Sequence, residues 1–508
     1  MSTSRELRGS IYGPLATIAG LATGQLVAAL KNGWHGPIVS IGNRIIDHVP
    51  SAIKGFAIRT FGVNDKTFLV LTIFAVVMVI SVYIGRKIAE GKRVIAFAIV
   101  FALTAVGGLA AIFDATSNLF SLLPSIFSGA ATILVLRWFA DRESYAYVSG
   151  VEVSRRDLFK AAGVVGAASL AATGLGRILH QRASVAVERL HIALPKPLKF
   201  LAKAPKDPAR SIPGLSPLFT PNADFYRIDT SLSTPNISVD TWRLKIDGMV
   251  AKPLTLTYAE LTSRTVFELD DTIACVSNDV GGNLVGNARW LGIRLDDLIR
   301  EVAPTSGADQ IMGYSSDGFS AGFPLAVLDG RDAMIAIGMN GEALPLEHGF
   351  PARVIVPGLY GYVSATKWLT HLELTRFDEK QGYWIPRGWS AQAPIKTQSR
   401  IDTPTDGATV KSGLTAIAGV AWAPTRGILK VEIQIGDTNW REAVLGPELA
   451  NTTWRQWWID WTPSSGNYKI MVRATDGNGD LQPMVRTSVE PNGAEGWHTI
   501  FVKVKDRP

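Results

Sequence analysis

The sequence predicts a chain of three parts: N-terminal transmembrane helices, an α+β domain and a C-terminal immunoglobulin-like β-sandwich. Its 508 residues suggest about three units at roughly 150 residues each. Hydrophobic residues make up 47% and charged residues only 19% of the chain, against about a quarter charged in soluble domains. Long uncharged apolar stretches occur only near the N-terminus, and strand-like alternation dominates near the C-terminus.

The charge distribution excludes several kinds of protein. Residues 1–180 carry 17 Lys and Arg against 9 Asp and Glu, whereas the remainder carries 34 against 35. Basic residues that flank apolar stretches are typical of membrane proteins, and we expect no nucleic-acid partner. The single cysteine excludes an intrachain disulfide and a zinc site built from several thiolates.

Four uncharged apolar stretches predict a membrane domain over residues 1–153, with the lipid bilayer as its partner. The stretches are 11–30, 67–85, 94–113 and 119–136, and each is about long enough to cross the hydrocarbon core as a helix. Charged residues interrupt segment 31–66 between the first two. We therefore expect it to be an amphipathic helix on the membrane surface rather than a fifth span.

The basic residues between the spans predict the orientation. Arg86, Lys87, Lys92 and Arg93 lie between the second and third stretches, so this loop is expected on the cytoplasmic side. Segment 31–66 then lies outside, although its five Lys and Arg conflict with a strict count of positive charges.

Residues 154–184 are predicted to be a signal and anchor helix. Ser154, Arg155, Arg156 and Lys160 resemble the twin-arginine export signal S-R-R-x-F-L-K, and a mildly apolar stretch follows. Such signals export folded domains that often carry a cofactor. We expect an uncleaved anchor, and therefore a multi-pass cell-membrane protein with its catalytic domain on the extracytoplasmic side.

Three further segments follow the anchor. Residues 185–221 are rich in proline and are expected to be a linker, and strands and helices alternate over 222–395. Residues 396–508 contain alternating stretches at 428–435, 454–461 and 468–474 without a plausible helix, which predicts the β-sandwich of immunoglobulin type.

The lone cysteine, Cys275, ends a strand-like stretch and enters a polar, glycine-rich loop. Functional sites are commonly built at such positions, and a thiolate there requires a nearby positive charge or metal. A small buried apolar residue is the alternative, and spacing alone leaves both open. The absence of a G-x-S-x-G motif argues against a serine hydrolase.

Several motifs resemble the sulfite-oxidase-like family of molybdenum enzymes, which bind molybdopterin. Cys275 and Asn278 form a C-x-x-N pattern, and His348 to Trp368 is similar to the family's H-G-x-P-x-R…P-G…G…K-W signature. Residues 339–345 are similar to its M-N-G-x-x-L-P segment, and 317–324 to its D-G…P-L element. The resemblance covers roughly residues 215–505.

The resemblance implies a sulfite-oxidase-type molybdopterin domain over 222–395, with molybdenum–molybdopterin as its cofactor. It makes Cys275 the catalytic residue and the protein ligand of molybdenum, and 396–508 a dimerisation-type domain, so that a homodimer remains open. Arginine and lysine suit the phosphate of the cofactor. The implied cofactor-binding residues are Asn222, Tyr226, Arg227, Asn278, Ser316, His348, Arg353, Ala365, Thr366 and Lys367.

Departures from the family pattern bear on the substrate. Val280, Ile337 and Ile228 stand where sulfite oxidases have polar residues, and a dianion requires paired cations. Arg227 and Arg289 restore part of that charge. We therefore expect two-electron oxo transfer that reduces a small S- or N-oxide, with a sulfite or other oxyanion dehydrogenase, or a non-catalytic membrane-tethered binding protein, as alternatives.

The electron partner is expected to be a separate membrane component. None of the seven histidines lies in a predicted span, and a haem inside the bilayer needs ligands on facing helices. A quinone-linked or haem protein is therefore the expected electron donor or acceptor.

Overall fold

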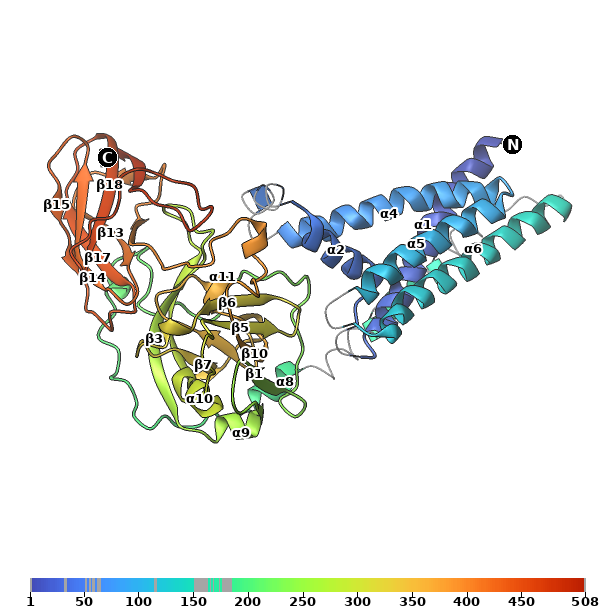
Figure 1. Cartoon of the computed structure of the whole chain (residues 1–508). Coiled ribbons are helices and arrows are strands. Elements are labelled where there is room, and N and C mark those ends of the chain that lie inside the picture. Colours follow the sequence, from blue (N-terminus) through green and yellow to red (C-terminus); the bar gives the residue numbers. More distant parts are fainter. Residues whose placement is uncertain are drawn as a thin grey trace. The chain divides into compact units, whose positions relative to one another are not determined.

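The computed structural model describes residues 2–31, 34–50, 65–113, 117–149 and 185–506, with separate helical positions within 53–61 and 163–175. It divides into two units (Figure 1): Met1–Glu188 with Asp229–Asn236, and Arg189–Ile228 with Ile237–Pro508. The twin-arginine-like residues 154–160 lie outside the described residues, so that interpretation stays a prediction.

The first unit contains the predicted membrane helices. They are α1 (Ser2–Ala28), α2 (Pro37–His48), α4 (Asp65–Ala89), α5 (Arg93–Ile112) and α6 (Leu123–Ser149). Four segments are long and apolar enough to cross a membrane, namely Leu7–Ala28, Asp65–Ala89, Arg93–Ile112 and Leu119–Tyr145. They confirm the four predicted stretches, and α2, with 12 residues, is too short to be a fifth.

Small residues bring the membrane helices close together. A Cβ added to Gly13 on α1 would lie 1.6 Å from the Ser81 carbonyl oxygen on α4, so only glycine permits this approach. On the outward faces, Val79, Val94 and Phe101 are 72%, 82% and 72% exposed. Large exposed apolar side chains in such numbers suit a lipid environment.

Segment Asp229–Asn236 clusters with the membrane helices, which corrects the predicted continuous domain over 222–395. Lys66 at the start of α4 forms an ion pair with Asp229, whose side chain is 2% exposed. The Lys66 ammonium also donates to the Ser231 carbonyl, at 2.5 Å. Leu232 lies against Gly42 of α2, so close that an added Cβ would be 2.4 Å from it. Sequence periodicity carries no sign of such a long-range contact.

Two sheets form the first part of the second unit. One has the order β2-β1-β10-β5-β6, and the other has the order β3-β4-β7-β8 with β9 paired to β7. The strands are β1 (Arg243–Gly248), β2 (Leu254–Thr257), β3 (Val266–Ala274), β4 (Val285–Arg294), β5 (Gln310–Ser315), β6 (Ser320–Pro324), β7 (Met334–Met339), β8 (Glu342–Ala343), β9 (Arg353–Ile355) and β10 (Leu369–Thr375). The helices are α8 (Val185–Leu190), α9 (Tyr258–Thr262), α10 (Leu295–Val302) and α11 (Gly361–Ser364).

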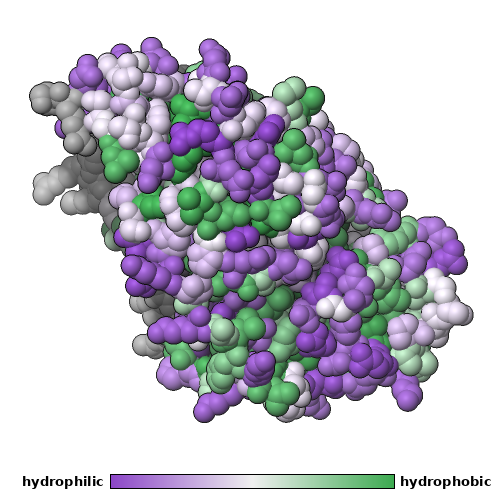
Figure 2. Space-filling view, turned by 90° about the vertical axis from the view of Figure 1, so that its left-hand side faces the viewer, coloured by the Kyte–Doolittle hydropathy of each residue, from purple (hydrophilic) through white to green (hydrophobic). Residues whose placement is uncertain are grey.

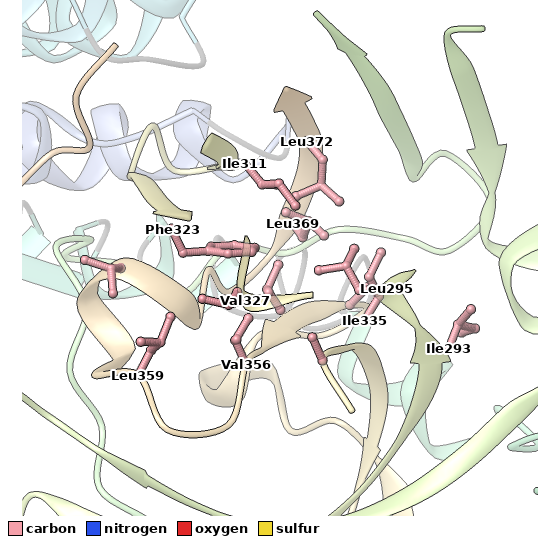
Figure 3. Close-up of a cluster of buried hydrophobic side chains, with 14 of the residues drawn as sticks. Ile293, Leu295, Ile311, Phe323, Val327, Ile335, Val356, Leu359, Leu369 and Leu372 are labelled. Atoms are coloured by element: carbon pink, nitrogen blue, oxygen red, sulfur yellow. The ribbon is translucent and has the colours of Figure 1, made fainter. Parts of the chain in front are cut away.

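Local sequence explains several of these elements. Thr257 and Glu260 form a capping box at the start of α9. The apolar face of α10 carries Leu295, Leu298, Ile299 and Val302 into the core. Side chains from both sheets meet there (Figure 3), where Ile311, Leu369 and Ile335 are fully buried. This core is the rigid support for the loops at the strand ends.

The proline-rich segment that was expected to be a linker, 185–221, belongs to the second unit from Arg189 onward. Leu215 and Leu218 are buried. The Leu218 carbonyl accepts hydrogen bonds from Asn287 at 2.8 Å and from the Trp454 ring at 3.0 Å. Backbone carbonyls satisfied by distant side chains explain why a segment without regular structure is ordered.

The C-terminal part consists of two sheets around one core. Their orders are β11-β13-β17-β16 and β12-β19-β18-β14-β15, and the structure describes no helix within 409–504. The strands are β11 (Gln398–Thr403), β12 (Thr409–Lys411), β13 (Thr415–Trp422), β14 (Ile428–Ile435), β15 (Arg441–Glu442), β16 (Val444–Leu445), β17 (Arg455–Trp461), β18 (Gly466–Asp476) and β19 (His498–Lys505). The immunoglobulin type and dimerisation remain predictions.

One face of the molecule is shown in space-filling form in Figure 2. Hydrophilic residues alternate there with small hydrophobic areas. Apolar side chains that are exposed in this scattered way are ordinary on a surface in water. The outward faces of α4 and α5 differ, because their exposed residues are predominantly large and apolar.

We expect His498 on β19 to make the fold acid-sensitive. Its Nδ1 accepts the Ile401 N–H at 3.0 Å, and burial, followed by Arg400, lowers the pKa of His498 to about 4. In the unfolded chain the pKa of His498 is near 6.5, so between pH 6.5 and pH 4 its imidazole is protonated in the unfolded chain but not in the folded chain. Stability is therefore complete above about pH 6.5 and falls by roughly 2 kcal/mol towards pH 4, after discounting for partial exposure. Thermal unfolding of the full chain and of His498→Gln across this range measures the difference, and equal slopes would contradict it.

Candidate active site

Cys275 lies directly after β3, at the start of the loop that leads to β4. It is 8% exposed and unpaired, and its N–H donates to the Leu284 carbonyl at 2.9 Å. Burial raises the pKa of the Cys275 thiol, and hydrogen bonds from Ser277 oppose that shift. The thiol is therefore held in a fixed place but is not ionised by a protein cation.

Asn278 holds the loop that carries Cys275. Its side-chain oxygen accepts the Leu284 N–H at 2.8 Å, and an added Cβ on Gly282 would lie 2.5 Å from the same oxygen. The asparagine of the C-x-x-N pattern thus closes the turn that positions Cys275.

Asn222, in the loop before β1, is hydrogen-bonded to His348 and to residues 340–342. The Asn222 amide donates to Glu342 at 2.6 Å and accepts from Asn340 at 2.8 Å. His348 Nε2 lies 3.0 Å from the Asn222 carbonyl oxygen, which accepts a hydrogen bond from the Nε2–H tautomer. Burial, with Arg353 as the next cause, lowers the pKa of His348 to about 4, so the ring is neutral near pH 7.

Arg353 at the start of β9 is a deeply buried cation. It is 5% exposed and donates to the His348 carbonyl at 3.1 Å and the Ala365 carbonyl at 3.4 Å. Its guanidinium lies 5.1 Å from the centre of the Trp290 ring. Burial lowers the pKa of Arg353 to about 10, and Tyr226 and Asp271 oppose the shift. Its Nε has no hydrogen-bond partner within the described chain.

The remaining predicted residues surround the same region. Burial raises the pKa of Tyr226, with Cys275 as the next cause, so the phenol lies near the thiol. The Ser316 hydroxyl is buried without a partner among the described residues. Thr366 is 1% exposed, and Lys367 donates to the Glu347 carbonyl at 3.1 Å. Arg227 is partly buried.

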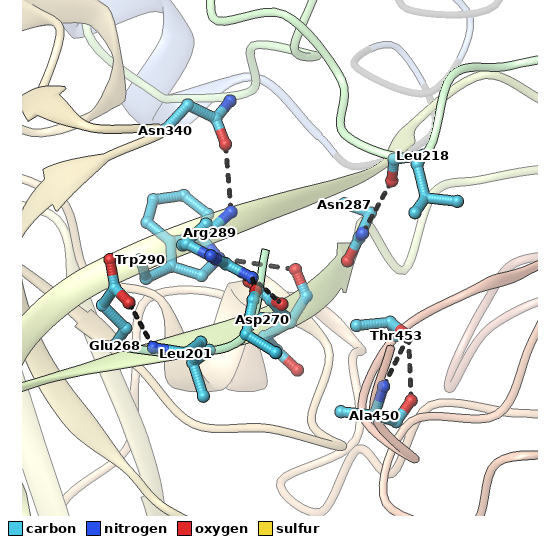
Figure 4. Close-up of polar contacts among 12 residues, drawn as sticks. Leu201, Leu218, Glu268, Asp270, Asn287, Arg289, Trp290, Asn340, Ala450 and Thr453 are labelled. Atoms are coloured by element: carbon cyan, nitrogen blue, oxygen red, sulfur yellow. Dashed lines mark hydrogen bonds and ion pairs between the residues drawn. The ribbon is translucent and has the colours of Figure 1, made fainter. Parts of the chain in front are cut away.

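Arg289 lies on the opposite face of the β3–β4 pair from Cys275. It forms two parallel hydrogen bonds with Asp270, at 2.7 and 2.8 Å (Figure 4). Asp270 is paired directly with Arg289 in the register, and side chains alternate along a strand, so even-numbered β3 residues face away from Cys275. The expectation that Arg289 contributes positive charge to the substrate pocket is therefore wrong.

Sequence reasoning missed Asp271, Phe225 and Trp290. Asp271 is 1% exposed and Trp290 is fully buried, and the Phe225 ring meets the His348 ring edge-on at 5.5 Å. The only available signal for Asp271 was its even spacing from Cys275 along the predicted strand.

The cofactor that the resemblance implies can be tested against these residues. The buried Arg353 Nε and Ser316 Oγ have no partner in the described chain, and an uncompensated buried guanidinium requires an anion or acceptor. Cys275 supplies an unpaired sulfur ligand. Soft sulfur together with unsatisfied donors matches a metal–dithiolene group that carries a phosphate.

The positions that depart from the family pattern lack charge. Val280 is 7% exposed, Ile337 is fully buried in the core, and Ile228 is 40% exposed. None of them offers a hydrogen-bond donor to a bound anion.

The chain resembles known proteins over its second unit. Residues 231–384 match the family model described as oxidoreductase molybdopterin binding domain. Mitochondrial sulfite oxidase of Homo sapiens is 28% identical over 341 residues, which is 56% of this chain and 62% of the human protein. Sulfite oxidase of Arabidopsis thaliana is 26% identical over 60% of this chain and 94% of its own length. The chain thus matches less than two thirds of the length of the mammalian relatives.

A solved structure shares the fold. Sulfane dehydrogenase SoxCD from Paracoccus pantotrophus aligns with a TM-score of 0.51 and 21% identity, covering 62% of this chain and 92% of that one. At this identity the likeness concerns the fold alone.

Proposed function

We propose that this chain is a sulfite-oxidase-like molybdopterin oxidoreductase, which the family model and the relatives support, and that it reduces a small S- or N-oxide at the outer face of a membrane. The overall conversion takes an S-oxide, two electrons and two protons to the sulfide and water. When bound, molybdenum–molybdopterin supplies two-electron oxo transfer. A membrane electron carrier of the quinone-linked or haem type supplies the electrons.

One observation carries the proposal: the chain buries an unpaired cysteine, Cys275, together with donors of Arg353 and Ser316 that have no partner among the described residues. In this proposal Cys275 holds the metal, while His348, Arg353, Thr366 and Lys367 hold the organic part of the cofactor. Asn222, Tyr226, Arg227, Asn278, Ser316 and Ala365 complete the site through the contacts above.

The proposed substrate class follows from the lack of positive charge at the positions where sulfite oxidases have polar residues. Arg289 is committed to Asp270 on the other face of the strand pair, and Val280, Ile337 and Ile228 carry no charge. A neutral S- or N-oxide needs less positive charge than a sulfite dianion. Sulfite or other oxyanion oxidation is the second candidate, because relatives carry the name sulfite oxidase.

The deciding experiment measures molybdenum and pterin per chain in protein purified from a host that makes and exports the cofactor. About one of each is expected. Reduced protein is then mixed with a dialkyl sulfoxide or an N-oxide, which should reoxidise it. Oxidised protein is separately mixed with sulfite. Reduction by sulfite without reoxidation by either oxide would support the second candidate, and metal-free protein would support a non-catalytic binding role.

The extracytoplasmic location is also part of the proposal. The ends of α4 support it, because Arg86 and Lys87 occupy its last turn and Lys66, which binds segment 229–236, lies in its first. A cysteine introduced as Asn439→Cys should react with a membrane-impermeant maleimide in intact spheroplasts, and Lys92→Cys should react only after lysis. The reverse pattern would contradict this orientation.

We expect Lys66→Met to release segment 229–236 from the membrane helices. Its partner Asp229 has a 2% exposed side chain, and removing one partner of a buried ion pair costs roughly 3–5 kcal/mol. Faster proteolysis within 229–236 and a lower thermal midpoint are expected. Lys87→Met removes a more exposed pair with Glu90 and should change neither, because such pairs contribute little. Equal cleavage of both variants would contradict the prediction.

A further inference from the structure

Asp271 is a buried acidic residue of β3, on the strand face opposite to Asp270. It is 1% exposed, and its Oδ1 has no hydrogen-bond partner within the described chain. A buried carboxyl oxygen without a donor is unfavourable, so its presence requires a reason.

The register places Asp271 on the same face as the site. Asp271 and Cys275 are four residues apart, and side chains of such residues point to the same side of a strand. Asp271 is paired with Ala288, and Ile273 with Gly286. An added Cβ on Gly286 would lie 2.7 Å from the Phe225 ring, so the loop that carries Phe225 and Tyr226 covers this face.

Asp271 and Arg353 act on each other electrostatically but form no ion pair. Burial raises the pKa of Asp271, and the Thr272 N–H and then Arg353 oppose that shift, while Asp271 opposes the lowering of the Arg353 pKa. None of the ion pairs of the described residues, which extend to 4.0 Å, joins them. Each instead keeps one unsatisfied polar atom, the carboxyl Oδ1 and the guanidinium Nε.

The distance along the strand excludes a role at the reacting atoms. Four residues of β-strand span about 13 Å, so Asp271 lies too far from the Cys275 sulfur to touch a group on its metal. It lies at a distance that suits the ring end of an elongated cofactor.

We propose that Asp271 binds the pterin ring of the cofactor, accepting hydrogen bonds from the amino group and the adjacent ring N–H of its aminopyrimidinone edge. This edge presents two donors side by side, and a carboxylate offers two acceptor oxygens in matching geometry. The inference rests on the proposed function, since it presumes that the chain holds molybdopterin. It assigns the ring end to Asp271 and leaves Arg353 to the acceptor groups of the cofactor.

The test compares Asp271→Val and Asp271→Asn with Asp270→Asn. Asp270 is the adjacent acid on the opposite face, bound to Arg289, and is therefore a matched control. Each full-length protein is purified from a host that makes the cofactor, and extracted pterin is oxidised and measured by fluorescence, with molybdenum counted per chain. The same proteins from a host unable to make the cofactor give the thermal midpoint of the cofactor-free chain.

Asp271→Val should lower pterin and molybdenum content by about 10-fold or more, and Asp271→Asn, which keeps one acceptor, by less. The midpoint of the cofactor-free Asp271→Val chain should be unchanged or higher, because an unsatisfied buried carboxyl is gone. Asp270→Asn should lower the midpoint and keep the cofactor.

Wild-type pterin content in Asp271→Val would overturn this inference but not the proposed function. A lowered thermal midpoint of the cofactor-free Asp271→Val chain would do the same, because it would indicate a structural role for Asp271. Wild-type protein without pterin would overturn the proposed function and this inference together.

Discussion

Cys275→Ser is expected to abolish turnover while the pterin remains bound. The cysteine is the one thiol of the chain, and in the proposed site His348, Arg353 and Lys367 would hold the rest of the cofactor. A hydroxyl is a harder and less acidic ligand than a thiol and suits a sulfur-bound metal poorly. Since changes to the neighbours of a metal ligand already cost 10- to 100-fold, we expect activity to fall by more than about 100-fold.

The measurement combines the rate of substrate reduction with the absorption spectrum and the molybdenum and pterin contents. Loss of the sulfur-to-metal absorption with retained pterin would assign Cys275 as the ligand. Asp279→Asn, an exposed change in the same loop, is the control and should leave the rate and spectrum unchanged. Full activity of Cys275→Ser would contradict the assignment.

Arg353→Met is expected to yield a stable chain without cofactor. Two charge-assisted hydrogen bonds to the cofactor, at about 1.5 kcal/mol or more each, amount to a loss of more than 100-fold in affinity. The cofactor-free chain should be destabilised only slightly. The change removes the hydrogen bonds of Arg353 to the His348 and Ala365 carbonyls, but it also removes a buried cation whose Nε has no partner among the described residues, and apolar replacements of buried charge are often neutral or stabilising.

Arg289→Met provides the opposite result. Asp270 has a 5% exposed side chain and is ion-paired with Arg289, so its carboxylate would lose its cation. We expect the free energy of unfolding to fall by roughly 3 kcal/mol while the cofactor content stays near that of the wild type. Thermal unfolding and pterin content, measured on both variants, separate the two roles. The same outcome for both arginines would contradict the assignment of faces.

Arg353 and Arg289 show which properties of a residue sequence patterns can predict. Arg353 belongs to a long motif, so the resemblance assigns it to the cofactor site, and its deep burial agrees with an internal position. Arg289 carries the same charge near the same strand, but its direction depends on the register of β3 with β4. A shift of one residue would turn it to the other face, and no local pattern specifies that register here.

The amino-acid sequence was sufficient for the four stretches that are long and apolar enough to cross a membrane, for the strand-rich C-terminal part and for the candidate ligand Cys275. Hydrophobic length and alternation are local properties that follow directly from residue order. The tertiary structure decided that segment 229–236 joins the membrane helices, that Asn278 holds a turn and that Arg289 pairs with Asp270. These features depend on contacts between residues distant in the chain, and such contacts arise only when strands pair and the core closes.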